Sequence, residues 1–241
     1  MIFETATLKP YMLIIPVLSV FFGCCRPAPA PAPTQADLNQ MYRSAVADAR
    51  VAEADEIYGE LTAITHDNTD LIWDDGKKRV LVVTWTSWAG YDDKIGQQME
   101  MSRETWVTVV PELKDFCGKP ETSEIPLRLE QLLGLPPGNG KNRFAELWVS
   151  PHDLFRPSPD PEITDRESEL SFPPGAGYEH KKWISDLANR SYDENGYPWT
   201  RLGYTYDWGN PADEVGLSEF VIRKGAFVEV RSVSENAAYC K

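Results

Sequence analysis

The residues best suited to ligand chemistry lie in one aromatic segment, residues 195–210, which reads NGYPWTRLGYTYDWGN. Flat apolar rings beside a carboxylate and a guanidinium suit sugars and cell-wall fragments, which stack on rings and hydrogen-bond to charged groups. Glycines at 196, 203 and 209 would allow the backbone turns that bring the rings to one surface. The candidate ligand-binding residues are Trp199, Arg201, Tyr204, Tyr206, Asp207 and Trp208.

Two alternatives to this interpretation stay open. Trp and Tyr are ordinary core residues, so we expect several of these rings to be interior, with Arg201 and Asp207 paired to their neighbours. In the other alternative, Asp207 and Glu219 are the catalytic acid and base of a hydrolase that cleaves envelope polysaccharide. Two carboxylates about 5–10 Å apart in an open aromatic cleft would favour the hydrolase, and salt-bridged or separated acids would favour a binding protein.

The segment that begins at Glu219 resembles a known catalytic strand. Glu219 precedes the apolar residues 220–222, the turn residue Gly225 and a second apolar strand, and this order is similar to the last catalytic strand of ADP-ribosyltransferases. Thr86 and Ser87 could mimic the hydroxyl motif of that family. The sequence departs from the family at Leu217, where many members carry Glu or Gln. The resemblance covers about a dozen residues, and we carry no activity over from it.

Four cysteines are present, and two of them, Cys117 and Cys240, fall in the folded body of the chain. Two cysteines in an exported domain are more often paired than free, because the compartment is oxidising. We therefore predict a Cys117–Cys240 disulfide. The alternative is a nucleophilic Cys117, which would need a partner histidine, and neither His152 nor His180 stands in a recognisable motif.

The sequence predicts no metal site and no cofactor. Three histidines stand singly, and the body contains no C-x-x-C or H-x-x-x-H spacing. The acidic loops at 66–70 and 193–196 lack the register of a calcium loop and are typical of Asx-rich turns. We find no glycine-rich phosphate loop, dinucleotide fingerprint or G-x-S-x-G motif.

Composition narrows the class of protein further. The chain has 241 residues, 42% of them hydrophobic and 25% charged, which excludes a disordered polymer and fits one globular domain. There are 37 acidic and 24 basic residues, giving a formal charge of -13. Nucleic-acid binding depends on clustered Lys and Arg, so we expect no nucleic-acid partner.

The N-terminus reads as an export signal. Residues 11–23, YMLIIPVLSVFFG, are uncharged, are too short to span a bilayer and follow Lys9, as in the apolar region of a signal peptide. Gly23-Cys24 resembles the cleavage box of bacterial lipoproteins, in which the cysteine receives a diacylglycerol. The expected organisation is a signal peptide at 1–23, a lipidated Cys24 with a Pro/Ala-rich spacer at 24–35, and one globular domain at 36–241.

The resemblance to lipoproteins implies a cellular localisation and a set of partners. The chain is expected to be exported and held at the bacterial cell envelope by its lipid, on the periplasmic face of the outer membrane. The run RPAPAPAP favours polyproline II, a stiff spacer that would hold the domain away from the membrane. We expect a non-enzymatic module that binds a cell-wall saccharide or an envelope protein.

The pattern of elements indicates an α+β fold, with a mixed or mostly antiparallel sheet, packed helices and long irregular C-terminal loops. Residues 36–64 carry a helical apolar stripe, and residues 71–88 resemble a hairpin whose second strand is central. Further strands are expected at 105–110 and 145–150, helices at 127–133 and 178–190, and a closing hairpin at 217–222 and 226–233.

Lipidation is directly testable. Because Cys24 follows the small residue of the cleavage box, metabolic labelling with a palmitate analogue is expected to mark the wild-type protein but not the Cys24→Ser variant. Label retained in that variant would reassign the lipid to another residue, and an unlabelled wild-type protein would refute lipidation.

Overall fold

The computed structural model describes residues 32–119, 125–193 and 195–240. All the elements below belong to one compact unit, which begins at Pro33. The predicted signal peptide, Cys24 and most of the spacer lie outside the described residues. Within them, no helix is long and apolar enough to cross a membrane.

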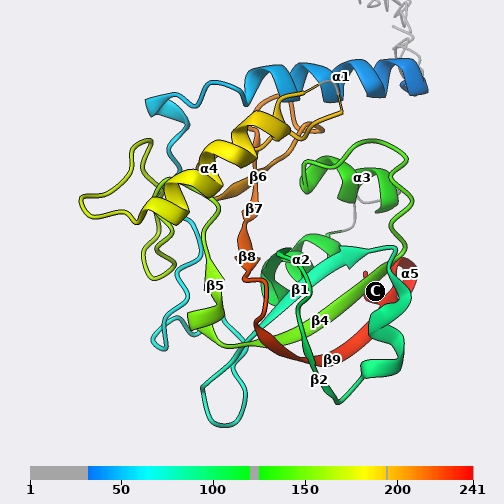
Figure 1. The fold of residues 1–241 in the computed structure, drawn as a ribbon. Helices are drawn as coiled ribbons and strands as arrows, with labels where there is room; N and C mark the ends of the chain where they lie inside the picture. Colours follow the sequence, from blue (N-terminus) through cyan, green and yellow to red (C-terminus); the bar gives the residue numbers. More distant parts are fainter. Residues whose placement is uncertain (1–31, 120–124, 194, 241) are drawn as a thin grey trace, which may run out of the picture. The chain divides into compact units, whose positions relative to one another are not determined.

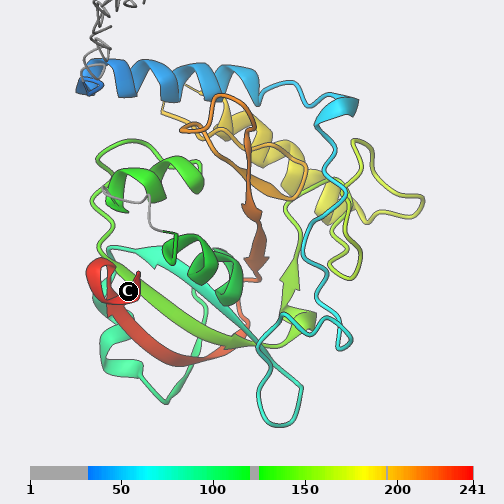
Figure 2. The same cartoon turned by 180° about the vertical axis from the view of Figure 1, so that it is seen from behind.

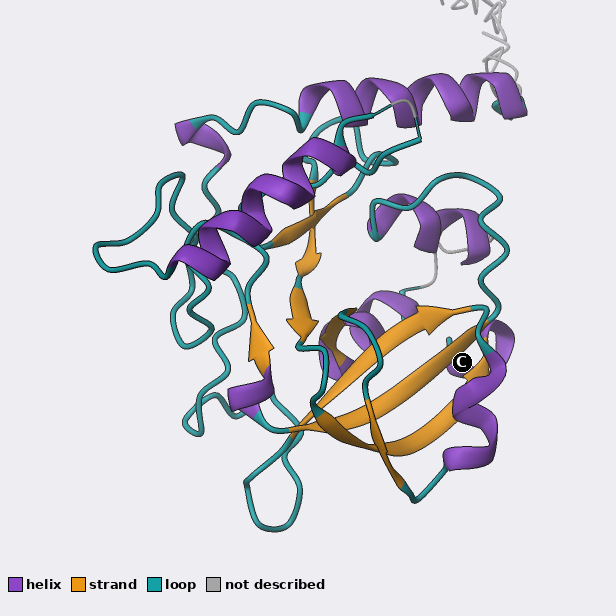
Figure 3. Cartoon of the chain, in the orientation of Figure 1, coloured by secondary structure: helices purple, strands orange, loops and turns teal. Residues whose placement is uncertain are grey.

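The fold is α+β, as the sequence predicts, and its sheet is antiparallel (Figures 1 and 3). Seven strands have the order β2-β9-β4-β1-β3-β8-β5, and β6 and β7 form a separate pair. The strands are β1 (Val80–Thr86), β2 (Gln98–Glu100), β3 (Thr105–Val109), β4 (Arg143–Val149), β5 (Leu154–Phe155), β6 (Tyr204–Tyr206), β7 (Val215–Ser218), β8 (Phe220–Ile222) and β9 (Phe227–Glu235). The helices are α1 (Gln35–Asp48), α2 (Val110–Cys117), α3 (Ile125–Leu132), α4 (Tyr178–Ser191) and α5 (Asn236–Tyr239), with 3-10 turns η1 (Ala54–Glu56), η2 (Ala89–Lys94) and η3 (Pro151–Asp153).

Strand β1 lies at the centre of the sheet because its apolar residues face both sides. Val80 and Val82 enter one cluster, which includes residues of β3, β4, β8 and β9. Leu81 and Val83 enter a second cluster, against helices α2, α3 and α5. Burial on both faces explains the continuous apolar run in this strand.

The helices on that second face begin and end where local chemistry requires. Strand β3 gives way to α2 at Val110, and Pro111 occupies the first turn of the helix, where its missing N–H leaves no bond unmade. Helix α3 begins at Ile125 and is followed by Gly134, whose φ of 61° suits a residue without a side chain.

The N-terminal helix is shorter than predicted. It ends at Asp48, and residues 57–73 follow an irregular path (Figure 2). Leu61 and Ile64 pack into two different clusters, and their backbone N–H groups bond the carbonyls of Arg166 and Ile163. One straight helix could not deliver both side chains to these separate places, so tertiary contacts override the helical pattern.

Of the two predicted hairpins, the first is present in a short form and the second is wrong. Trp73 and Val80 form an antiparallel bridge, flanked by backbone hydrogen bonds from Asp74 to Arg79 and from Leu81 to Ile72. The carboxylate of Asp74 closes the turn by accepting the N–H groups of Lys78 and Arg79. In the second, β8 and β9 do not pair with each other. Strand β8 pairs with β3 and β5, while β9 pairs with β4 and β2. The hairpin on which the ADP-ribosyltransferase resemblance depends is therefore not formed.

The predicted disulfide is confirmed. Cys117 ends α2 and bonds Cys240, with Cα atoms 4.6 Å apart and a sequence separation of 123. Both cysteines are buried in the cluster beneath α2 and α3. The bond therefore ties the C-terminus to the helical face of the sheet.

Removing this bond is expected to destabilise the domain. A Cys117→Ala/Cys240→Ala variant should lose about 2–4 kcal/mol of unfolding free energy, because the unfolded chain regains the entropy of a long loop. Urea denaturation with and without reductant measures the effect. Reductant should lower the wild-type midpoint and leave the variant unchanged; equal midpoints for oxidised wild type and variant would contradict the prediction.

Candidate functional site

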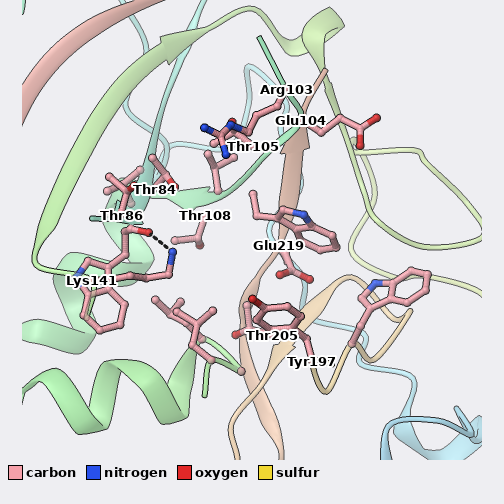
Figure 4. Close-up of a pocket in the computed structure, with 18 of the residues that line it drawn as sticks. Thr84, Thr86, Arg103, Glu104, Thr105, Thr108, Lys141, Tyr197, Thr205 and Glu219 are labelled. Carbon is pink, nitrogen blue, oxygen red and sulfur yellow. Dashed lines mark hydrogen bonds between the residues drawn. The ribbon is translucent and has the colours of Figure 1, made fainter. Parts of the chain in front are cut away.

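A cavity of about 790 Å³ lies between the sheet, α4 and the aromatic segment (Figure 4). Its walls come from the end of β1 and the residues after it, from β3 and the loop before it, from α4, and from residues 197–206. A volume of this size is in the range that encloses a small-molecule ligand. The site is therefore built by elements that are far apart in the sequence.

Glu219 is the acidic group inside this cavity. It stands alone between β7 and β8 and points into the space that Lys141, Thr108 and Tyr197 also border (Figure 4). In the described part of the chain its carboxyl has no hydrogen-bond or ion-pair partner. The protein around it raises the pKa of Glu219 to about 8, because an ionised carboxylate loses hydration there. At neutral pH the group is mostly a protonated acid, able both to donate and to accept.

The backbone fixes Glu219 from both sides. The N–H of Ser218 donates to Glu112 Oε2 at 2.8 Å, and the N–H of Glu219 donates to the carbonyl of Gly203 at 2.9 Å. Gly203 has a φ of 78°, and a Cβ there would lie 2.7 Å from a carbon of Arg156, so only glycine fits. Phe220 then enters β8 beside β3. The side chain of Glu219 is thus directed by a rigid frame.

Glu112 supports this frame from the first turn of α2. Its carboxylate accepts hydrogen bonds from the hydroxyls of Thr62 and Thr108 as well as from the N–H of Ser218. Ser218 in turn accepts the N–H of Thr62 at 2.8 Å. Burial raises the pKa of Glu112, and these hydrogen bonds oppose that rise by stabilising the ionised form.

Lys141 supplies the basic group of the cavity. Its Nζ donates to the carbonyl of Trp85 at 3.1 Å, at the end of β1 (Figure 4). Its own backbone is held by Asn139, which accepts its N–H, and by Asn236, which donates to its carbonyl. Burial lowers the pKa of Lys141. Among the residues described, no carboxylate pairs with this ammonium.

Aromatic rings form much of the remaining wall. Trp106 and Trp183 stack with ring centres 6.3 Å apart, and the indole N–H of Trp183 donates to Glu104 at 2.8 Å. Trp88 and Tyr197 are 45% and 50% exposed beside the cavity, so their ring surfaces are open to a ligand. Threonine hydroxyls lie between the rings, at Thr84, Thr86, Thr105, Thr108 and Thr205.

The predicted aromatic segment is divided between core and cavity. Tyr204 and Trp208 are buried, and their polar atoms donate to the carbonyls of Glu56 and Leu135. Trp199 is 5% exposed and Tyr206 is partly buried, yet both border the cavity. The first two rings therefore act in packing, and the other two contribute to the site wall.

The charged members of the segment lie outside the cavity. Arg201 adopts a φ of 61° and donates to the carbonyl of Arg50. Asp207 is 3% exposed and accepts two hydrogen bonds from the guanidinium of Arg128. Neither Arg201 nor Asp207 borders the cavity that holds Glu219. The carboxylate pair Asp207–Glu219 is not assembled, and only Glu219 of the two is available to a ligand.

Sequence reasoning missed Lys141, Trp88, Trp106 and Trp183. The stretch after residue 83, TWTSW, carried a usable signal, because threonines replace valines where a central strand would otherwise stay apolar. Lys141 had no such signal, since it lies in a glycine-rich loop and is brought to the cavity by the pairing of β4 with β1.

Comparison of the chain with protein-family models, curated proteins and solved structures gave no match. In the parts that the structure describes, no group of three His, Cys, Asp or Glu side chains could hold a metal ion. The argument for function therefore depends on the geometry of the cavity.

The raised pKa of Glu219 has a measurable effect on stability. An unfolded glutamate ionises near pH 4.3 and the folded one near pH 8, so the folded state holds the extra proton between these values and stability falls as pH rises. Glu219→Gln resembles the protonated form. It should match wild type near pH 5 and be more stable by about 1–3 kcal/mol at pH 8.5.

Urea denaturation at both pH values tests this expectation. Glu179→Gln is the matched control, because Glu179 is exposed on α4 and lies outside the cavity. A Glu219→Gln variant that is less stable than wild type at pH 8.5 would contradict the conclusion that the folded protein raises the pKa of Glu219.

Proposed function

We propose that the protein is a lipid-anchored cell-envelope protein whose folded domain binds a cell-wall fragment in the cavity at Glu219. The lipoprotein-like N-terminus supports the proposed localisation at the cell envelope. The observation that carries the binding function is the unpartnered carboxyl of Glu219 inside an aromatic cavity of about 790 Å³. Glu219 is partly buried and its carboxyl is poorly hydrated, so a ligand that hydrogen-bonds to it replaces hydration that the protein has already removed.

A small ligand fits this site better than a protein partner does. Protein interfaces are broad surfaces, whereas a concave cavity with a few polar groups among aromatic rings is typical of small-molecule sites. Stacking surfaces at Trp88 and Tyr197 with hydroxyls at Thr84 and Thr86 suit a ligand that has both flat apolar faces and many hydrogen-bonding groups. Cell-wall saccharides and their attached peptides have this chemistry.

A hydrolase that cleaves envelope polysaccharide is the second candidate. A carboxyl with a pKa near 8 is suited to act as a general acid, and this property of Glu219 favours catalysis. A glycosidase needs a second carboxylate. Asp207 is held by Arg128, which leaves Glu104, an exposed residue at the cavity that accepts the indole N–H of Trp183.

The binding function predicts a specific loss in one variant. Solubilised peptidoglycan fragments should bind the wild-type domain at pH 8.5, where Glu219 is mostly ionised, and Glu219→Gln should weaken this binding by about tenfold or more, since hydrogen bonds to charged groups contribute about 1.5–3 kcal/mol. Isothermal titration calorimetry measures the affinity. Glu179→Gln should bind as wild type does.

The same samples separate binding from catalysis. Fragments recovered unchanged after long incubation support the binding protein, whereas shorter products that disappear with both Glu219→Gln and Glu104→Gln support the hydrolase. No binding by the wild-type protein, together with no cleavage, would refute the proposed function.

A further inference from the structure

The cavity contains two groups of opposite charge type on different walls, and neither has a charged partner. Glu219 enters from the junction of β7 and β8, and Lys141 enters from the loop before β4 (Figure 4). No ion pair joins them, although each would be stabilised by an opposite charge. Among the described residues, the ammonium of Lys141 donates to a backbone carbonyl alone, and the carboxyl of Glu219 has no hydrogen-bond partner. The cavity therefore separates the ammonium of Lys141, a hydrogen-bond donor, from the carboxyl group of Glu219.

The residues that border the cavity carry both charge types, without the acidic excess of the whole chain. The chain carries an excess of acidic residues, with a formal charge of -13. The described residues that border the cavity include three basic groups, Arg103, Lys141 and Arg190, and two acidic groups, Glu104 and Glu219. A purely cationic or purely anionic ligand would leave one set unmatched. A ligand with both charges matches both sets.

The remaining walls suit the uncharged parts of a peptide. Backbone amides of a ligand would find hydroxyl partners at Thr84 and Thr86, and an apolar side chain would find the stacked rings of Trp106 and Trp183. The cavity has the volume of sites that hold drug-sized molecules, which leaves room for more than one amino-acid residue.

We propose that the ligand is a short peptide with free ends, which places its ammonium against Glu219 and its carboxylate against Lys141. This inference rests on the proposed binding function and narrows it to a peptide released from the cell wall. A neutral saccharide is the competing ligand, and the experiment below distinguishes the two.

Binding of a peptide should release or take up protons, whereas binding of a neutral saccharide should not. Glu219 is mostly protonated at pH 7, and an adjacent ammonium favours its ionised form, so binding should release a proton. The free amino end of a peptide has a pKa near 8, so at pH 9 it must take up a proton to bind as an ammonium. The net exchange should therefore change from release at pH 7, through zero near pH 8, to uptake at pH 9. The other ionisable groups that border the cavity are Tyr91, Arg103, Glu104, Lys141, Arg190, Tyr197 and Tyr206, and Glu112 lies behind the strand junction.

The test is calorimetric titration of the full domain in buffers that differ in ionisation enthalpy. The probes are the dipeptide Ala-Phe, its N-acetyl form, its C-terminal amide and chitotriose. We expect Ala-Phe to bind with a net release near one proton at pH 7 and net uptake at pH 9. Each blocked form should bind at least tenfold more weakly, because one of the two charges is missing.

Matched variants assign the two ends of the ligand. Glu219→Gln should weaken Ala-Phe binding and abolish proton release at pH 7, and it should leave the weak binding of N-acetyl-Ala-Phe unchanged. Lys141→Met should weaken Ala-Phe and leave the C-terminal amide unaffected. The controls Glu179→Gln and Lys224→Met change exposed residues outside the cavity and should behave as wild type.

Two results would overturn the inference. Binding of chitotriose with no proton exchange, and no binding of Ala-Phe, would make the ligand a saccharide and leave the proposed binding function intact. Failure of all four probes would refute the peptide assignment, while the solubilised peptidoglycan fragments decide independently whether the cavity binds cell wall at all.

Discussion

The hydrogen bonds to the carboxylate of Glu112 are the interaction on which the site depends. This group joins three segments, because it accepts from Thr62 in the N-terminal irregular stretch, from Thr108 in β3 and from Ser218 at the end of β7. A carboxylate that accepts several hydrogen bonds fixes their donors strongly. Glu219 follows Ser218 directly. The hydrogen bond from Ser218 to Glu112 therefore helps to fix the direction in which the side chain of Glu219 leaves the backbone. The disulfide at the other end of α2 holds the helix that carries Glu112.

A second buried charge orders the irregular part of the molecule. The guanidinium of Arg156 is fully buried and donates to the carboxylate of Asp165 and to the carbonyls of Thr62, Asp165 and Glu167. It thereby satisfies backbone groups that no sheet or helix could satisfy. Its side chain also fills the space beside Gly203, whose carbonyl holds Glu219. Loop order and site geometry are therefore parts of one network.

Other contacts hold the surroundings of the cavity in place. Strands β3 and β8 pair beside Glu219, and Asp207 of the aromatic segment is bound by Arg128, so these elements are committed elsewhere and leave the carboxyl of Glu219 free. The structure thus maintains an acid without a hydrogen-bond partner and an amine without a charged partner, as far as the described residues show. Groups of this kind are typical of binding and catalytic sites, where the ligand supplies the missing partner.

The sequence by itself determined what local chemistry controls. The apolar run in β1 required a central strand, Pro111 and Gly134 marked element boundaries, and two cysteines in the body implied a disulfide. The sequence predicted the site only in part. Trp199, Tyr206 and Glu219 border the cavity, but Arg201 and Asp207 do not. Only the tertiary structure decided that β8 pairs with β3 rather than β9, that Lys141 faces Glu219, and that residues 57–64 leave the helical path. Each of these depends on contacts between segments remote in the chain, and their energies have no signature in local periodicity or composition.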